Sequence, residues 1–373
     1  MAVLAGGVQS AAATTRTTTA TPVNLSVGSA VSLNGALANG NNILLGGAHD
    51  LVTAGPITLG AGAGGVFGID TALNTNQTFT VNNVVTWGAT QDLVGIALVV
   101  NAGGSITIKD ATTKLVTVAG GTITMRDALL GATITSGTVT AMRDVNGADL
   151  AISGGTITAM NDILGGRNLV ASGGVITTMR HNTGNATLTN NALVTQTGNT
   201  AGNLSVAGSA LYTGGDASDI GGNVTIATTN PGMNTIRDVA AAHDVTVNRG
   251  NLTMRNVGQD ITVNGAAGAA AAIVTGNVGR NVVLANAGKV TIKGNVNGTL
   301  NGAGTAIFDG PGTVTGVVGG GGAVTKIVID TVGTRTFSAA WTAAGELNFA
   351  QNGTANLTGA ASWWNKHYYR HCW

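Results

Sequence analysis

"GTVTAMRDVNGADLAISGGTITAMND", residues 137–162, nearly repeats itself. A Thr-x-Thr-Ala-Met phrase occurs twice, and each copy is followed by a polar residue and an Asp. The methionines that end this phrase belong to a longer series, Met125, Met142, Met160 and Met179, whose members recur at nearly constant intervals. Such regular spacing indicates a structural repeat rather than a single motif.

A second phrase alternates with the first. It places a turn-forming Asn or Asp before a short alternating run, as in "ADLAI" (148–152), "RNLVA" (167–171), "GNLSV" (202–206), "GNVTI" (222–226), "HDVTV" (243–247), "QDITV" (259–263) and "RNVVL" (280–284). One unit is therefore a strand, a Gly-Gly or Asn-Gly turn, a second strand and a looser turn. The period is too short for a leucine-rich horseshoe or a propeller blade, and it suits one coil of a solenoid.

The composition supports this interpretation. The chain of 373 residues has 59 Gly, only 9% charged and 3% aromatic residues, and a single cysteine. Thr, Val, Ile, Asn and Gly dominate, and these residues favour strands and tight turns. The sequence predicts an all-β, right-handed parallel β-helix (β-solenoid) with coils of about 18–19 residues, its hand following from the usual hand of parallel crossovers.

Three regions are predicted. Residues 1–20 form a leader, in which Ala11-x-Ala13 is typical of a signal-peptide cleavage site, although an ordinary Ala-rich leader fits as well. Residues 21–361 form one solenoid domain. Residues 362–373, "SWWNKHYYRHCW", break the composition abruptly, which favours a frameshifted or truncated end. The alternative is a zinc site formed by His367, His371 and Cys372, which would still need a fourth ligand.

Charge and motifs exclude several functions. A net charge of +1 gives no basic surface for nucleic acid. No apolar run reaches the roughly 18 residues of a membrane helix, so no transmembrane segment is expected. The sequence has no phosphate-binding loop and no nucleophile elbow, and we expect no cofactor.

Charged residues recur at matched places in the repeat, so stacked coils would bring them to one edge. Asp127, Asp144 and Asp162 could then act as acid and base on a polysaccharide. The competing interpretation is structural: Asp closes turns, and Arg beside Asp offsets its charge. No His or Tyr accompanies the cluster, so we expect a protein that is not an enzyme. The candidate binding residues are the edge arginines Arg126, Arg143, Arg180, Arg237 and Arg255.

Paired threonines suggest another alternative. The pairs Thr122/Thr124, Thr138/Thr140 and Thr156/Thr158 would stack into an array of hydroxyls and methyls that resembles ice-binding solenoids. Against this, Val175 interrupts the array, and Thr is a common residue of exposed strands.

Several phrases resemble known secreted proteins. "HDVTVNRGNLTMRNVGQDITVNG" (243–265) and "GRNLVASGGVITTM" (166–179) resemble repeats of filamentous-haemagglutinin-like adhesins. "GELNFAQNGTANLTG" (345–359) resembles the passenger regions of rickettsial outer membrane protein B-type autotransporters. The resemblance implies a β-helical passenger that is exported across the inner membrane of a Gram-negative bacterium and displayed at the cell surface. The chain departs from that family because no barrel of amphipathic strands follows residue 360.

The function predicted from these observations is a non-catalytic bacterial surface or secreted adhesin, or a fragment of an autotransporter passenger. Its partners would be a host-cell surface protein or glycan, or neighbouring surface molecules. The polysaccharide-acting enzyme and the ice-binding solenoid remain the alternatives.

Overall fold

The fold is known from a computed structural model that describes residues 78–86, 92–111, 114–342 and 344–360, and the backbone of short strands between 15 and 69 and at 369–370. Within these residues every regular element is a β-strand except one 3-10 turn, Gly265–Ala267. All of their strand pairs are parallel; for example, Met142 lies beside Met160 and Asp162 beside His181. The predicted all-β parallel β-helix is therefore confirmed.

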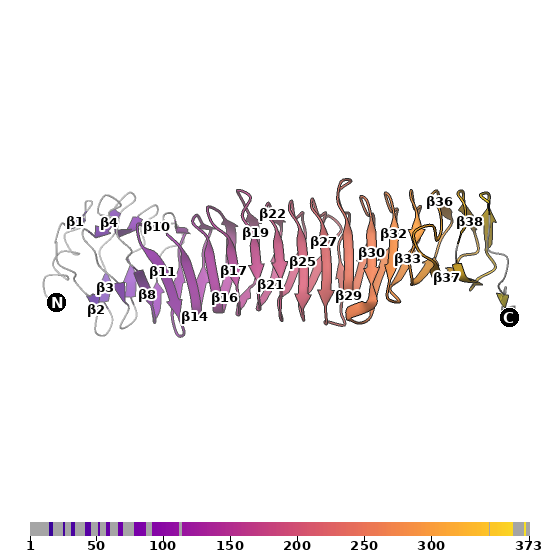
Figure 1. Cartoon of the computed structure of the whole chain (residues 1–373). Coiled ribbons are helices and arrows are strands. Elements are labelled where there is room, and N and C mark those ends of the chain that lie inside the picture. Colours follow the sequence, from indigo (N-terminus) through magenta and orange to yellow (C-terminus); the bar gives the residue numbers. More distant parts are fainter. Residues whose placement is uncertain are drawn as a thin grey trace. The chain divides into compact units, whose positions relative to one another are not determined.

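The chain divides into two compact units. Unit 1 comprises Met1–Gly184 and Ala192–Val194, and unit 2 comprises Asn185–Asn191 and Thr195–Trp373. Each coil of a unit contributes up to three strands, and each strand pairs with the equivalent strand of the next coil (Figure 1). Stacking therefore produces three ladders of parallel strands, which we call the first, second and third faces in chain order.

Unit 1 shows all three faces. The first face contains β2 (Leu25–Ser26), β5 (Leu51–Val52), β8 (Thr78–Val81), β11 (Ala97–Asn101), the start of β14 (Val116–Thr124), the start of β16 (Ala132–Val145), β17 (Leu150–Ile152) and β20 (Leu169–Ala171). The second face contains β3 (Val31–Leu33), β6 (Ile57–Leu59), β9 (Val84–Thr86), β12 (Ser105–Thr107), the end of β14, the middle of β16, β18 (Thr156–Ile157) and β21 (Val175–Met179). The third face contains β1 (Thr15–Thr17), β4 (Asn42–Leu45), β7 (Val66–Ile69), β10 (Asp92–Val94), β13 (Asp110–Ala111), β15 (Asp127–Ala128), the end of β16, β19 (Met160–Ile163) and β22 (His181–Asn182).

Unit 2 repeats the plan with a thinner third face. Its first face contains β23 (Ala186–Leu188), β25 (Leu204–Gly208), β27 (Val224–Thr228), the start of β29 (Val245–Met254), β30 (Ile261–Asn264), β32 (Val282–Ala285) and β34 (Leu300–Asn301). Its second face contains β26 (Leu211–Gly214), β28 (Met233–Thr235), the end of β29, β31 (Ala270–Val274), β33 (Lys289–Ile292), β35 (Thr305–Phe308), β37 (Val324–Ile329), β39 (Ala344–Phe349) and β41 (Tyr369–Arg370). The strand β24 (Leu193–Gln196) carries the chain from one unit into the other. The third face has single bridges such as Val278 with Val296, and then β36 (Gly312–Val314), β38 (Thr334–Phe337) and β40 (Thr354–Leu357).

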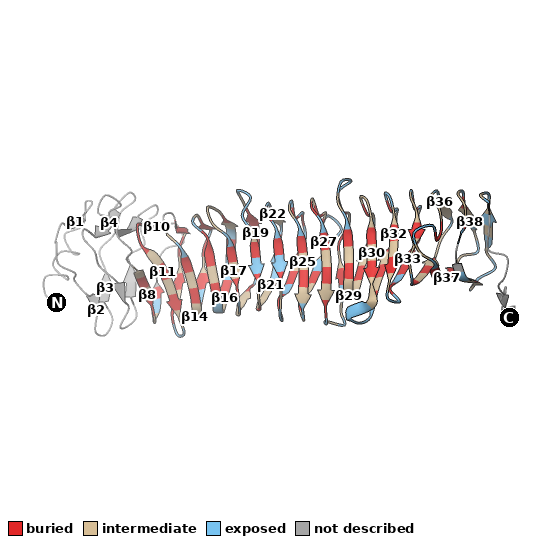
Figure 2. Cartoon of the chain, viewed as in Figure 1, coloured by how far each residue is buried: buried red, intermediate tan, exposed pale blue. Residues whose placement is uncertain are grey.

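The core consists of stacked apolar side chains, because alternate residues of each strand point inward. Burial alternates along the strands accordingly, and buried bands run across neighbouring coils in Figure 2. Met125, Met142, Met160 and Met179 are at most 4% exposed and lie in equivalent core positions of successive coils. The repeated phrase at 137–162 therefore reflects the pitch of the coil.

Coil length varies around the expected value. Thr138 pairs with Thr156 and Thr156 with Val175, so these two coils have the length that the sequence predicts. The coil that sets Val116 beside Ala132 is shorter. Those that set Val224 beside Val245 and Leu51 beside Phe79 are longer. Since the paired strands are short, the additional residues lie in the connections between faces.

Glycines turn the chain from the first to the second face in unit 1. Gly137 and Gly155 both have positive φ, +84° and +75°. A Cβ at Gly155 would lie 2.5 Å from the carbonyl oxygen of Gly137 in the preceding coil. Glycine is therefore required here both by backbone conformation and by the close approach of stacked coils.

We expect Gly155→Ala to lower the free energy of unfolding by about 2 kcal/mol or more, because it combines left-handed strain with a backbone clash. Gly166→Ala is the matched control: its φ is also positive, +72°, but a Cβ there would have nothing within 4 Å. That control should lose only about 1 kcal/mol from strain. Urea unfolding of both variants makes the comparison, and equal losses would contradict the close-approach explanation.

Candidate functional site

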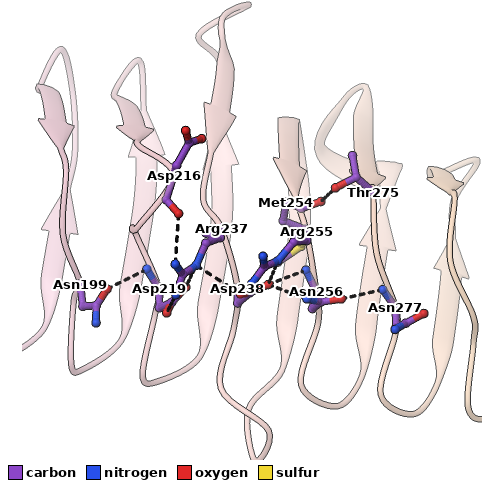
Figure 3. Close-up of polar contacts among 10 residues, drawn as sticks. All are labelled: Asn199, Asp216, Asp219, Arg237, Asp238, Met254, Arg255, Asn256, Thr275 and Asn277. Atoms are coloured by element: carbon purple, nitrogen blue, oxygen red, sulfur yellow. Dashed lines mark hydrogen bonds and ion pairs between the residues drawn. The ribbon is translucent and has the colours of Figure 1, made fainter.

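The charged edge lies where the chain enters the third face. In unit 2 an Asn or Asp occupies this place in successive coils. The side-chain oxygen of Asn199, Asp238, Asn256 or Asn277 accepts a hydrogen bond from the backbone N–H at the same place in the next coil, whereas Asp219 is joined to the next coil through Arg237 (Figure 3). We call the set Asn199, Asp219, Asp238, Asn256, Asn277 and Asn295 the second-corner ladder. Its N···O distances run from 2.8 Å, as between Asn277 N and Asn256 Oδ1, to 3.2 Å, between Asp219 N and Asn199 Oδ1.

Arginines reinforce this ladder where its members are aspartates. Arg237 donates from Nε and Nη2 to both carboxylate oxygens of Asp219 in the preceding coil, and Arg255 does the same to Asp238 (Figure 3). The remaining nitrogen of the Arg237 guanidinium, Nη1, donates to the backbone oxygen of Asp216 at 3.2 Å. Bidentate pairs of this kind fix geometry as well as charge.

The equivalent edge of unit 1 has the same construction. Arg143 donates from Nε and Nη2 to Asp127 at 2.9 and 2.6 Å. Arg126 forms the same pair with Asp110, and Arg180 with Asp162. Asp127 and Asp162 are only 4% and 8% exposed, while the arginine side chains are about half exposed. The carboxylates thus form the inner part of the edge and the guanidinium groups its surface.

The series is interrupted at Asn161, which occupies the place of an arginine. Asp144 consequently has no arginine of the following coil, and its contacts are Arg143 of its own coil, at 3.0 Å, and the backbone of Asp162. One oxygen, Oδ1, is buried without a hydrogen bond. Burial and then the charge of Asp127 raise the pKa of Asp144, whereas the hydrogen bonds from Arg180 lower the pKa of Asp162.

A separate ladder lies where the chain enters the first face. Asn185, Asn203, Asn223, Asp244, Asp260 and Asn281 form this first-corner ladder of unit 2. Each side-chain oxygen accepts the backbone N–H of the next coil, for instance Asn223 N to Asn203 Oδ1 at 2.8 Å and Thr299 N to Asn281 Oδ1 at 2.9 Å. In unit 1 Asn168 N donates to Asp149 in the same way. The Asn or Asp of the second sequence phrase is therefore a hydrogen-bonding link between coils as well as a turn residue.

The structure places the residues singled out in the sequence as follows. Asp127, Asp144 and Asp162 lie in register on one edge, as expected from their spacing. The edge arginines pair chiefly with the aspartate one coil earlier, rather than with the aspartate next to them in sequence. His367, His371 and Cys372, like most of the leader at 1–20, lie outside the described residues. No group of three potential metal-ligating side chains occurs in the described part of the chain.

Sequence reasoning missed several participants. Asp110 and Asp219 accept arginine pairs, and Arg280 pairs with Asp260 at 2.8 and 2.7 Å at the first corner. The sequence could have indicated these aspartates, because each lies one coil before an arginine. Arg335, fully buried in unit 2, had no such indication, because it falls outside the regular repeat.

The threonine pairs align only in part. On the second face of unit 1, Ser105 lies beside Thr122, Thr122 beside Thr138, and Thr138 beside Thr156. In the second column, Thr107 lies beside Thr124, but a register shift then sets Thr124 beside Ala141. The array therefore begins one coil earlier than the sequence indicated, and one of its two columns is displaced.

Comparison of the chain with family models, with curated proteins and with solved structures finds no match. The resemblance to autotransporter passengers and haemagglutinin-like repeats consequently stays a prediction. No helix among the described residues has the length and hydropathy to span a membrane.

Completing the interrupted ladder should stabilise the protein. In Asn161→Arg the new guanidinium reaches Asp144 as Arg180 reaches Asp162, and we expect the free energy of unfolding to rise by about 0.5 kcal/mol. Asn161→Gln, which adds length without charge, is the control. A loss of stability in the arginine variant, or an equal gain in both variants, would contradict the interpretation that Asn161 stands where the series lacks an arginine.

Neutralising Asp144 and neutralising Asp162 should change the free energy of unfolding in opposite directions. The pKa of Asp144 is raised, so its ionised form destabilises the fold at neutral pH, and Asp144→Asn should be more stable than wild type at pH 7. That gain should shrink as the pH falls through the raised pKa. The pKa of Asp162 is lowered, so Asp162→Asn should be less stable at pH 7, and its deficit should begin to shrink only as the pH falls below the ordinary value of about 3.8. Urea unfolding between pH 3 and pH 7 tests both directions.

Proposed function

We propose that this chain is a non-catalytic, β-helical surface or secreted protein of a Gram-negative bacterium that acts as an adhesive spacer. Its partner would be a host-cell surface protein or glycan, or a neighbouring surface molecule. The bacterial source and the export across the inner membrane rest on the sequence resemblance alone.

One observation carries the proposal: two of the three carboxylates that a polysaccharide-acting enzyme would need are used to join coils. Asp127 and Asp162 each accept two hydrogen bonds from an arginine of the next coil, so Asp144, which lacks such an arginine, has no freely ionising carboxylate partner beside it. A general acid or base must be able to exchange its proton with substrate, and a carboxylate held by a bidentate guanidinium keeps its charge. This arrangement favours a structural role for the edge.

The outward surfaces suit repeated weak contacts. On the first face of unit 2, a column of hydroxyl side chains occupies one register position in consecutive coils: Thr187, Ser205, Thr225, Thr246 and Thr262. Partly exposed arginines line the edge of each unit. Many equivalent sites on a regular surface give avidity even when each contact is weak.

Adhesion is tested with beads coated with the full chain. We expect them to bind host cells, and blank beads and beads that carry an unrelated β-helix should not. Triple substitution of Arg126, Arg143 and Arg180 by Gln should reduce binding if the edge is the contact. Absence of binding by the wild-type chain, or reducing-sugar release from a glycan panel that Asp144→Asn abolishes, would contradict the proposal.

Ice binding is the second candidate, favoured by the column Ser105, Thr122, Thr138 and Thr156 on the second face of unit 1. It predicts thermal hysteresis that Thr156→Lys removes. Thr225→Lys, at an equivalent outward position on the first face of unit 2, is the control and should leave it intact. No hysteresis in the wild-type chain would eliminate this candidate.

A further inference from the structure

The part of the chain that the structure describes contains five Asn-Gly pairs, which begin at Asn146, Asn264, Asn297, Asn301 and Asn352. Asparagine before glycine can lose its side-chain amide, because the glycine nitrogen reaches Cγ of the asparagine without hindrance from a side chain of its own. The sequence makes the five pairs equivalent, since each has the same two residues. Their hydrogen bonds differ, and these separate the pairs.

At Asn146 the two reacting groups already lie together. The backbone N–H of Gly147 donates to Oδ1 of Asn146 at 2.8 Å, so the nitrogen lies beside Cγ, the carbon that carries this oxygen. Among the five described pairs, this is the one in which the glycine N–H donates to the preceding asparagine side chain. Both residues are partly exposed, so a base in the solvent can reach the N–H. Such proximity is the main requirement for a reaction within one chain.

The corner itself requires glycine at position 147. Gly147 has a positive φ, +74°, and a Cβ there would lie 2.4 Å from the carbonyl oxygen of Leu129 in the preceding coil. A larger residue is excluded both by the backbone conformation and by this contact, so the nitrogen beside Asn146 stays unhindered. The stacking of the coils therefore maintains a reactive pair at this corner.

Two of the other pairs are held by hydrogen bonds between coils. Oδ1 of Asn264 accepts a hydrogen bond from Nδ2 of Asn286 in the next coil at 2.8 Å. The nitrogen of Gly302, which would attack Asn301, donates instead to the carbonyl oxygen of Gly322 in the next coil at 2.9 Å. These bonds must break before the ring can close, and the loss of one such bond slows the reaction about fivefold.

We propose that Asn146 is a modification site of the folded protein, at which spontaneous deamidation produces aspartate and isoaspartate. The Gly147 nitrogen gives its proton to the solvent and bonds to Cγ of Asn146, the bond from Cγ to Nδ2 breaks, and Nδ2 takes up a proton and leaves as ammonia. Water then opens the cyclic imide. Cleavage of the new bond to Cγ gives aspartate, and cleavage of the bond between the Gly147 nitrogen and the main-chain carbonyl carbon of Asn146 gives isoaspartate.

The isoaspartate form alters the coil, because it adds a carbon to the main chain between Val145 and Leu150. Both of these side chains are fully buried and in register with the next coil, Val145 beside Ile163 and Leu150 beside Leu169. The additional length must therefore be taken up within residues 146–149. Deamidation thus changes one corner of unit 1 irreversibly and adds a negative charge to it.

Ageing of the full chain, folded and in guanidinium chloride, tests the site. Both samples are kept at mildly alkaline pH, and peptide mapping by mass spectrometry gives the rate of amide loss at each asparagine. Unfolded, Asn146, Asn264 and Asn301 should react at similar rates, because the neighbouring glycine is the same. Folding should slow Asn264 and Asn301 about fivefold or more, whereas Asn146 should stay within about twofold of its unfolded rate.

Asn146→Gln is the control, because ring closure through the longer side chain is slow, and the peptide that contains position 146 should then stay unmodified. A rate at Asn146 that folding reduces as much as the rates at Asn264 and Asn301 would overturn the proposal. The same holds if the peptide from Asn146→Gln gains the deamidation mass as fast as the wild-type peptide, because the modified residue would then be a different one.

Discussion

Parallel in-register stacking of coils is the constraint on which the rest of this structure depends. Each coil must present, at every corner, an acceptor for a backbone donor of the next coil, because unpaired buried N–H groups are costly. On the faces the strands satisfy this requirement themselves. At the corners strand pairing ends, and Asn and Asp side chains take over, as in the link from Asn223 to Asp244 at 2.9 Å.

The ladders explain why few charged and aromatic residues are sufficient to stabilise this fold. Stacked Val, Ile, Leu and Met side chains fill the interior, and the corners are held by short polar side chains. Where a corner carries aspartates in successive coils, their mutual repulsion must be offset, and Arg126, Arg143 and Arg180 supply the positive charge one coil on. Asn161 marks the single rung between Met125 and Met179 at which this compensation is missing. Burial and then the charge of Asp127 raise the pKa of Asp144, and no arginine of the following coil offsets them.

The period of the methionines and of the Asn/Asp phrase was sufficient to predict the parallel β-helix, the common edge of Asp127, Asp144 and Asp162, and the length of the coils in the middle of unit 1. The shorter and longer coils elsewhere were not predicted, since insertions in the connections do not disturb the pairing of short strands. The direction of the arginine pairs was also missed. Adjacent Arg126 and Asp127 suggest a local pair, which is present at 3.2 Å, but both hydrogen bonds of the Arg126 guanidinium go back one coil to Asp110.

Arg335 shows a different limit of sequence reasoning. An isolated arginine in a threonine-rich strand, "TRTF", looks like an exposed residue, and only the alternation of β38 places it inward. Composition was the misleading signal here, because the alternation that puts Phe337 inward also puts Arg335 inward.

Hydrogen exchange at the corners tests the central claim most directly. If side-chain ladders join the coils, the amides of Asn203, Asn223 and Asn281, which donate to ladder oxygens, should exchange about as slowly as those of the neighbouring face strands. Asn203→Ala should then accelerate exchange at Asn223 while leaving Asn281 unchanged. Rapid exchange of these amides in the wild-type chain, at the rate of exposed turns, would contradict the account.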